Sequence, residues 1–104
     1  LSGTVKNILL VDSSMQGCKV DIRCKFSMNI PTYAYFYDEN NNNIGTKMIY
    51  DYGYNHPELG PDYVTSFDGT RQIEIPKGTV RMEVQIQMKS SGAYARIYEL
   101  TIAN

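Results

Sequence analysis

Tyrosine occupies every second position of residues 33–37, as Tyr33, Tyr35 and Tyr37. If this segment is a strand and Phe36 is buried, the three rings lie together on the outer face, because successive side chains of a strand point to opposite sides. Exposed rings can stack on the apolar C–H face of a sugar, while planar polar side chains nearby bind its hydroxyls. The spacing therefore indicates a sugar-binding surface. The alternative is that the tyrosines form cross-strand pairs that stabilise a sheet.

Polar side chains of the required kind alternate with apolar ones in residues 19–27 and 80–88. This alternation predicts two strands that each have one buried and one exposed face. We expect the exposed faces to provide the hydrogen bonds to sugar hydroxyls. The candidates are Arg23, Arg81, Glu83, Gln85 and Gln87.

A second candidate surface lies in residues 51–70, where glycines and prolines predict a long loop. Tyr52, Tyr54 and His56 alternate there and continue a pattern that begins at Tyr50. These three residues are further candidates for ligand binding. The sequence does not choose between the loop and the strand surface, and Tyr50 and Tyr52 could instead hold the loop against the core.

Residues that could perform catalysis are sparse, and His56 is the only histidine. Glycoside hydrolysis requires two carboxylates about 5–10 Å apart across a bound sugar. Asp21, Glu74 and Glu83 are possible carboxylates, but a domain of this size rarely encloses a substrate. We therefore expect no enzyme activity.

Metal and cofactor sites are also not predicted. Asp38, Asn40 and Asn42 match the start of a calcium-binding loop, but Asn43 and Ile49 stand where that loop needs glycine and glutamate. The segment is better explained as a hairpin turn. Cys18 and Cys24 have too few partners for a zinc site, and in one extended strand region they would lie about 20 Å apart, too far for a disulfide.

Turn residues punctuate the whole chain, and helical periodicity is weak. The alternation predicts strands at residues 5–11, 19–28, 33–37, 44–49, 72–75, 80–88 and 93–102, with residues 33–49 forming a hairpin. Strands at intervals of roughly ten residues are typical of an all-β fold, here an antiparallel β-sandwich.

Composition limits the classes of function. The 104 residues are enough for a single domain, 1–104, and the balance of 10 basic and 11 acidic residues argues against nucleic-acid binding. No apolar run is long enough to span a membrane. The chain has no signal peptide and no initiator methionine, so we expect it to be a segment of a larger polypeptide.

Three stretches resemble carbohydrate-binding modules that have a galactose-binding-like jelly-roll fold. They are the aromatic strand and turn of residues 20–45 (with AYFYDEN at 34–40), the turn and alternating strand of residues 73–84 (IEIPKGTVRMEV), and the closing strand of residues 92–102. The family often has glycine where Asn41 stands and an Asp-Asp pair where Tyr98 and Glu99 stand. That end of the domain often holds a structural calcium in the family, and the change leaves calcium without support from the motif.

The resemblance implies non-catalytic saccharide binding that attaches a larger protein to a cell-surface or polymeric saccharide. It implies a location that is extracellular, at the cell surface or in a phage virion, where such modules occur in tails and baseplates. Many domains of this fold bind no sugar, so a structural or protein-interaction module is the alternative.

Overall fold

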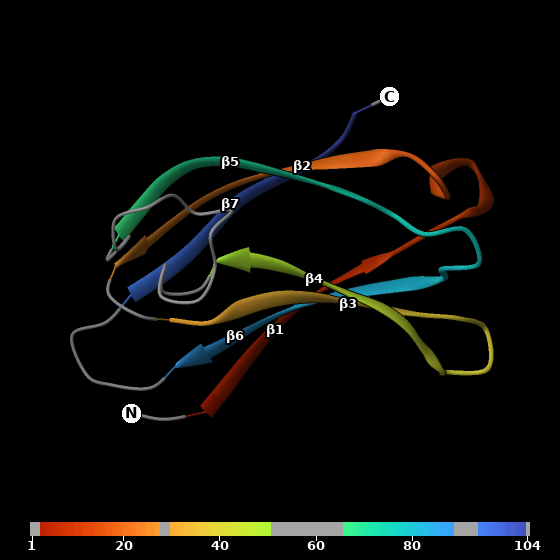
Figure 1. Ribbon diagram of the computed structural model, residues 1–104, viewed down its shortest axis with the longest axis horizontal. Helices are drawn as coiled ribbons and strands as arrows, with labels where there is room; N and C mark the ends of the chain where they lie inside the picture. Colours follow the sequence, from red (N-terminus) through yellow and green to blue (C-terminus); the bar gives the residue numbers. More distant parts are fainter. Residues whose placement is uncertain (1–2, 28–29, 51–65, 89–93, 104) are drawn as a thin grey trace.

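The computed structural model describes residues 3–27, 30–50, 66–88 and 94–103 (Figure 1). Its elements are β1 (Gly3–Leu10), the short 3-10 helix η1 (Ser13–Met15), β2 (Lys19–Ser27), β3 (Thr32–Tyr37), β4 (Asn43–Tyr50), β5 (Ser66–Glu74), β6 (Arg81–Met88) and β7 (Tyr94–Ala103). They form a four-stranded sheet in the order β1-β6-β3-β4 and a three-stranded sheet in the order β5-β2-β7. All pairings are antiparallel, so the expected all-β, sandwich-like architecture is confirmed.

The core lies between the two sheets because alternate residues of the central strands face inward. In β2 the inward residues include Ile22 and Phe26, and in β3 they include Phe36, all of them buried. The ring of Phe26 stacks on that of Tyr50 at the end of β4, with centroids 4.8 Å apart and planes 4° from parallel. This stack joins the two sheets, and it places Tyr50 in the core.

The β3–β4 hairpin has the turn that the polar cluster predicts. Asp38 Oδ1 accepts hydrogen bonds from the backbone N–H groups of Asn40 and Asn42, each at 2.9 Å. Asn41 has φ +65°, in the left-handed region that asparagine tolerates. The carboxylate therefore holds the turn, and the hairpin interpretation of this segment is confirmed.

Strand β5 is longer than predicted. The sequence predicts a strand at 72–75 after a loop at 51–70, but β5 begins at Ser66. That part of the prediction is wrong because Gly69, which indicates a break, sits inside the strand opposite Cys24. The ring of Phe67 covers it, so a Cβ at Gly69 would lie 3.1 Å from Phe67 Cζ. Residues 51–65 lie outside the described part of the chain.

Cys18 and Cys24 are both thiols and are not joined in a disulfide, as predicted. Cys18 precedes β2, and its Sγ donates to the carbonyl of Ser14. Cys24 is fully buried in β2, and this burial raises the pKa of its thiol to about 11. The Cys24 side chain therefore acts as a small apolar core group.

Among the described residues, no helix has the length and apolar character needed to cross a membrane.

Candidate functional site

The expected tyrosines lie on the outer face of the four-stranded sheet. Strand β3 pairs with β6 so that Tyr33 is opposite Gln85, Tyr35 is opposite Glu83 and Tyr37 is opposite Arg81. The intervening β3 residues are buried, whereas the three tyrosines are partly exposed. We call this set of six side chains the tyrosine face.

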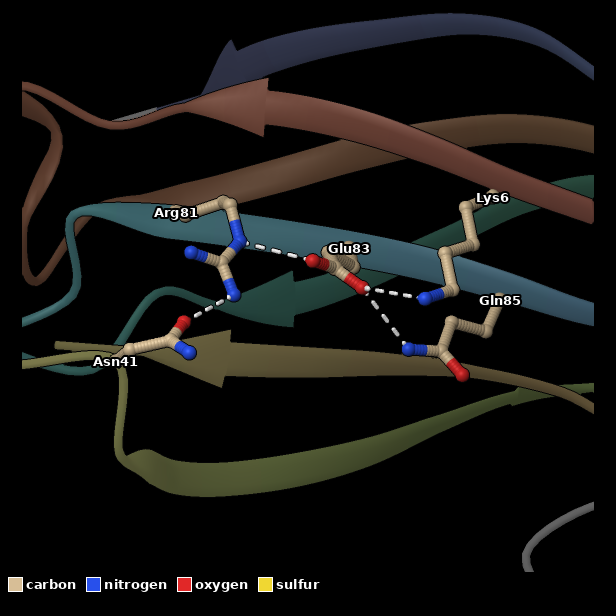
Figure 2. Close-up of polar contacts among 5 residues, drawn as sticks. All are labelled: Lys6, Asn41, Arg81, Glu83 and Gln85. Carbon is tan, nitrogen blue, oxygen red and sulfur yellow. Dashed lines mark hydrogen bonds and ion pairs between the residues drawn. The ribbon is translucent and has the colours of Figure 1, made fainter.

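Glu83 lies at the middle of the tyrosine face, where its carboxylate forms hydrogen bonds and an ion pair with neighbouring polar side chains (Figure 2). Its Oε2 accepts a hydrogen bond from Arg81 Nε at 2.8 Å, and its Oε1 accepts one from Gln85 Nε2 at 3.0 Å. Lys6 Nζ approaches Oε1 from β1 at 3.8 Å. The Glu83 side chain is only 10% exposed because these neighbours cover it.

The environment of Glu83 keeps it ionised. Burial raises the pKa of its carboxyl, but the hydrogen bonds from Arg81 and Gln85 and the charges of Lys6 and Arg81 outweigh burial. The net result is a pKa below the ordinary glutamate value. Because both of its oxygens already accept protein contacts, Glu83 orients Arg81 and Gln85 rather than presenting an open carboxylate.

Arg81 connects the tyrosine face to the hairpin turn. Its Nη2 donates to Asn41 Oδ1 at 2.7 Å, and its guanidinium carbon lies 4.3 Å from the centroid of the Tyr37 ring. One side of Tyr37 is therefore covered by a cation. Tyr33 and Tyr35 form a tilted pair, with centroids 6.5 Å apart and planes at 53°. Both of these rings are partly exposed.

The other predicted ligand-binding residues have different positions. Gln87 lies near the end of β6, opposite Thr4 and two residues beyond Gln85, which is the last β6 residue opposite a tyrosine. The structure does not bring Arg23 to the tyrosine face, because β2 belongs to the other sheet. Tyr52, Tyr54 and His56 lie outside the described residues.

Arg23 belongs to a separate cluster on the three-stranded sheet. Its Nη2 lies 2.6 Å from Asp68 Oδ1, and its Nη1 donates to backbone carbonyls in β2 and β5. Its guanidinium carbon also lies 5.1 Å from the centroid of Tyr98, and Lys25 Nζ lies 5.8 Å from that of Tyr94. The rings of this surface therefore contact protein cations.

Sequence reasoning missed Lys6 and Asn41 as neighbours of the tyrosine face. Lys6 is the one charged residue of β1, so its exposure could be expected from the sequence. The pairing of β1 with β6 cannot be predicted from local sequence, because it joins segments at least seventy residues apart. Asn41 is recognisable as a turn residue, but its bond to Arg81 follows only from that tertiary arrangement.

The carboxylates considered for catalysis do not share a site. Glu83 is on the outer face of one sheet, while Asp21 and Glu74 are on strands of the other. Packed sheets lie about 10 Å apart, and these side chains point away from each other across the core. Within residues 3–27, 30–50, 66–88 and 94–103, no three His, Cys, Asp or Glu side chains gather as a metal site would need.

Tyr33, Tyr35 and Tyr37 are partly exposed in the part of the chain that the structure describes. Three shallow hollows of the described residues lie elsewhere, and none of their lining residues is Tyr33, Tyr35 or Tyr37. One of these hollows lies where β1 approaches β7 and includes Ile8 and Ile97. An open face suits an extended ligand that lies across strands better than a small molecule that must be enclosed.

Comparisons with known proteins give no relative: no protein-family model, curated protein or solved structure matches this chain significantly.

Proposed function

We propose that this protein is a non-catalytic carbohydrate-binding module and that its ligand lies on the tyrosine face. The observation that carries the proposal is the row-by-row pairing of Tyr33 with Gln85, Tyr35 with Glu83 and Tyr37 with Arg81. Partly exposed rings beside oriented amide and guanidinium groups match the two needs of sugar recognition, which are stacking on C–H faces and hydrogen bonding to hydroxyls.

The jelly-roll, galactose-binding-like fold is part of this proposal. Two pairings support it: β2 pairs with β7, and β3 pairs with β6, which both lie between β2 and β7 in the sequence. The chain also crosses repeatedly from one sheet to the other, as in a jelly roll. The corresponding biological setting is attachment of a larger extracellular, cell-surface or virion protein to a polymeric saccharide.

The fixed polar groups define how the sugar binds. Gln85 and Arg81 are held by Glu83, so little side-chain freedom is lost when they contact a hydroxyl. Tyr33 and Tyr35 supply the stacking surface. Because an open polar face exchanges water contacts for sugar contacts, we expect dissociation constants of roughly micromolar to millimolar.

The test is saccharide binding by matched tyrosine variants. A glycan array that includes bacterial cell-wall polysaccharides identifies the ligand, and titration calorimetry then compares the wild-type protein with Tyr35→Ala and with the double variant Tyr33→Ala/Tyr35→Ala. We expect Tyr35→Ala to weaken binding by about tenfold, equivalent to about 1.4 kcal/mol, and the double variant to weaken it further.

Tyr98→Ala is the matched control, because Tyr98 is 48% exposed on the other sheet. It should leave binding unchanged. Full binding by the double tyrosine variant, or loss of binding in Tyr98→Ala alone, would reject the tyrosine face as the site.

A structural or protein-interaction module without sugar binding is the second candidate. It is favoured by exposed apolar side chains on β1, which are unusual for a strand at the edge of a sheet. A folded protein that binds no saccharide on the array would support this candidate over the first.

A further inference from the structure

Strand β1 is an exposed edge with apolar side chains on both of its faces. Val5 is 50% exposed, and Ile8 and Leu10, which face the opposite way, are 58% and 73% exposed. Within the described residues, β1 pairs only with β6, so its other edge presents backbone N–H and C=O groups without a neighbouring strand. Such an edge is a template for pairing with another strand.

The other three edge strands of the two described sheets carry features that oppose pairing. Strand β4 has two register shifts against β3, and β7 has one against β2. Strand β5 carries the charged side chains of Asp68, Arg71 and Glu74. Shifts and charges of this kind are the usual protection of sheet edges. Strand β1 has no register shift against β6 and no proline, and Lys6 is its one charged residue.

We propose that β1 pairs with β1 of a second copy of this chain, antiparallel and centred on Asn7. A two-fold axis perpendicular to the sheet keeps the same face of both copies on one side. The axis passes midway between the two copies of one residue, which therefore lie opposite each other. Centring on Lys6 would oppose two ammonium groups, which is unfavourable. Centring on Ile8 would oppose Thr4 to Asp12, beyond the end of the strand.

The Asn7-centred register pairs Thr4 to Leu10, which is all of β1 except Gly3. It places Val5 opposite Leu9 and Lys6 opposite Ile8 of the second copy, with no like charges in contact. The two four-stranded sheets then become one sheet of eight strands, and both tyrosine faces lie on the same side. The pairing does not depend on what the tyrosine faces bind.

The first test is sedimentation equilibrium of the 104-residue protein over a concentration series. We expect the mean mass to rise from 11.8 kDa toward twice that value. Ile8→Lys places like charges opposite Lys6 in two symmetric pairs, so its dissociation constant should rise by about tenfold. Ile8→Glu forms opposite-charge pairs at the same positions and should dimerise as well as the wild-type protein or better.

The two substitutions at Ile8 should affect folding in the opposite order to their effect on dimerisation, so the two effects can be separated. In each monomer Ile8 is opposite Glu83, so lysine at this position is favourable and glutamate unfavourable for folding. Circular dichroism of each variant checks that it is folded. Ile44→Lys is the matched control, since Ile44 is 39% exposed on the β4 edge, and it should leave association unchanged.

Disulfide cross-linking tests the register of the proposed β1–β1 pair directly. In a Cys18→Ser background, Asn7→Cys should form a covalent dimer on oxidation, because opposite residues of antiparallel strands have Cα atoms about 4.5–5.5 Å apart. Leu10 is 73% exposed, but in this register it lies opposite Thr4 of the second copy and far from its own copy, so Leu10→Cys should not cross-link. A wild-type protein that stays monomeric, equal weakening by Ile8→Lys and Ile8→Glu, or preferential cross-linking of Leu10→Cys would overturn the proposal.

Discussion

Glu83 carries the negative charge around which the polar side chains of the tyrosine face are arranged. Its contacts to Arg81 and Gln85 are charge-assisted hydrogen bonds, and its side chain is largely removed from water. Hydrogen bonds to charged groups contribute about 1.5–3 kcal/mol. Glu83 therefore stabilises the fold as well as orienting the candidate ligand contacts.

Replacing Glu83 with glutamine should lower the free energy of unfolding by about 1.5–3 kcal/mol at neutral pH. Because the pKa of Glu83 is lower in the folded protein than in the unfolded chain, its charge stabilises the fold above the unfolded pKa. This contribution is lost as the pH falls through the folded pKa. The difference between wild type and Glu83→Gln should thus shrink in acid.

Urea denaturation at pH 7 and pH 3 measures this difference. Asp12 and Asp38 also have lowered pKa values, from hydrogen bonds with Ser14 and with the Asn42 backbone, but both are present in either protein and cancel in the comparison. A difference that is the same at both pH values would contradict the assigned role of the Glu83 charge.

At the scale of elements, the β3–β4 hairpin brings Asn41 to Arg81. Both Asn41→Gly and Asn41→Ala remove the hydrogen bond to Arg81. Only alanine also places a Cβ at φ +65°, which costs about 1–2 kcal/mol. We therefore expect Asn41→Ala to lower the urea midpoint more than Asn41→Gly does. The reverse order would show that the turn is not held in the left-handed conformation.

Most strands could be predicted from local patterns, since alternation in residues 19–28, 33–37 and 80–88 matches β2, β3 and β6 closely. The outward direction of the tyrosines follows from the same period of two. Strand β5 was predicted too short because the sequence shows Gly69 but not the Phe67 ring that covers it.

The composition of the candidate site was only partly predictable, because strand pairing is non-local. The polar residues of β6 meet the tyrosines since β6 and β3 are neighbours, whereas Arg23 is separated from them because β2 joins the other sheet. Both strands have the same alternating pattern, so no local signal distinguishes them. Lys6 was missed for the same reason, as its place beside Glu83 depends on the pairing of β1 with β6.

At the scale of the whole molecule, the Phe26–Tyr50 stack connects the two sheets through the core. Phe26→Ala should lower the free energy of unfolding by about 3–5 kcal/mol, because it removes a fully buried ring and leaves a cavity. Far- and near-ultraviolet circular dichroism should report one shared unfolding transition. A loss below about 1 kcal/mol would show that this stack does not hold the sheets together.

Saccharide binding on the tyrosine face is tested most directly by a nuclear magnetic resonance titration of the isotope-labelled protein with the saccharide identified on the array. We predict that backbone amide shifts concentrate in β3 and β6, around Tyr33, Tyr35 and Gln85, with little change around Tyr98 in β7. Shifts confined to the three-stranded sheet, or to residues 51–65, would contradict binding on the tyrosine face and place the ligand elsewhere.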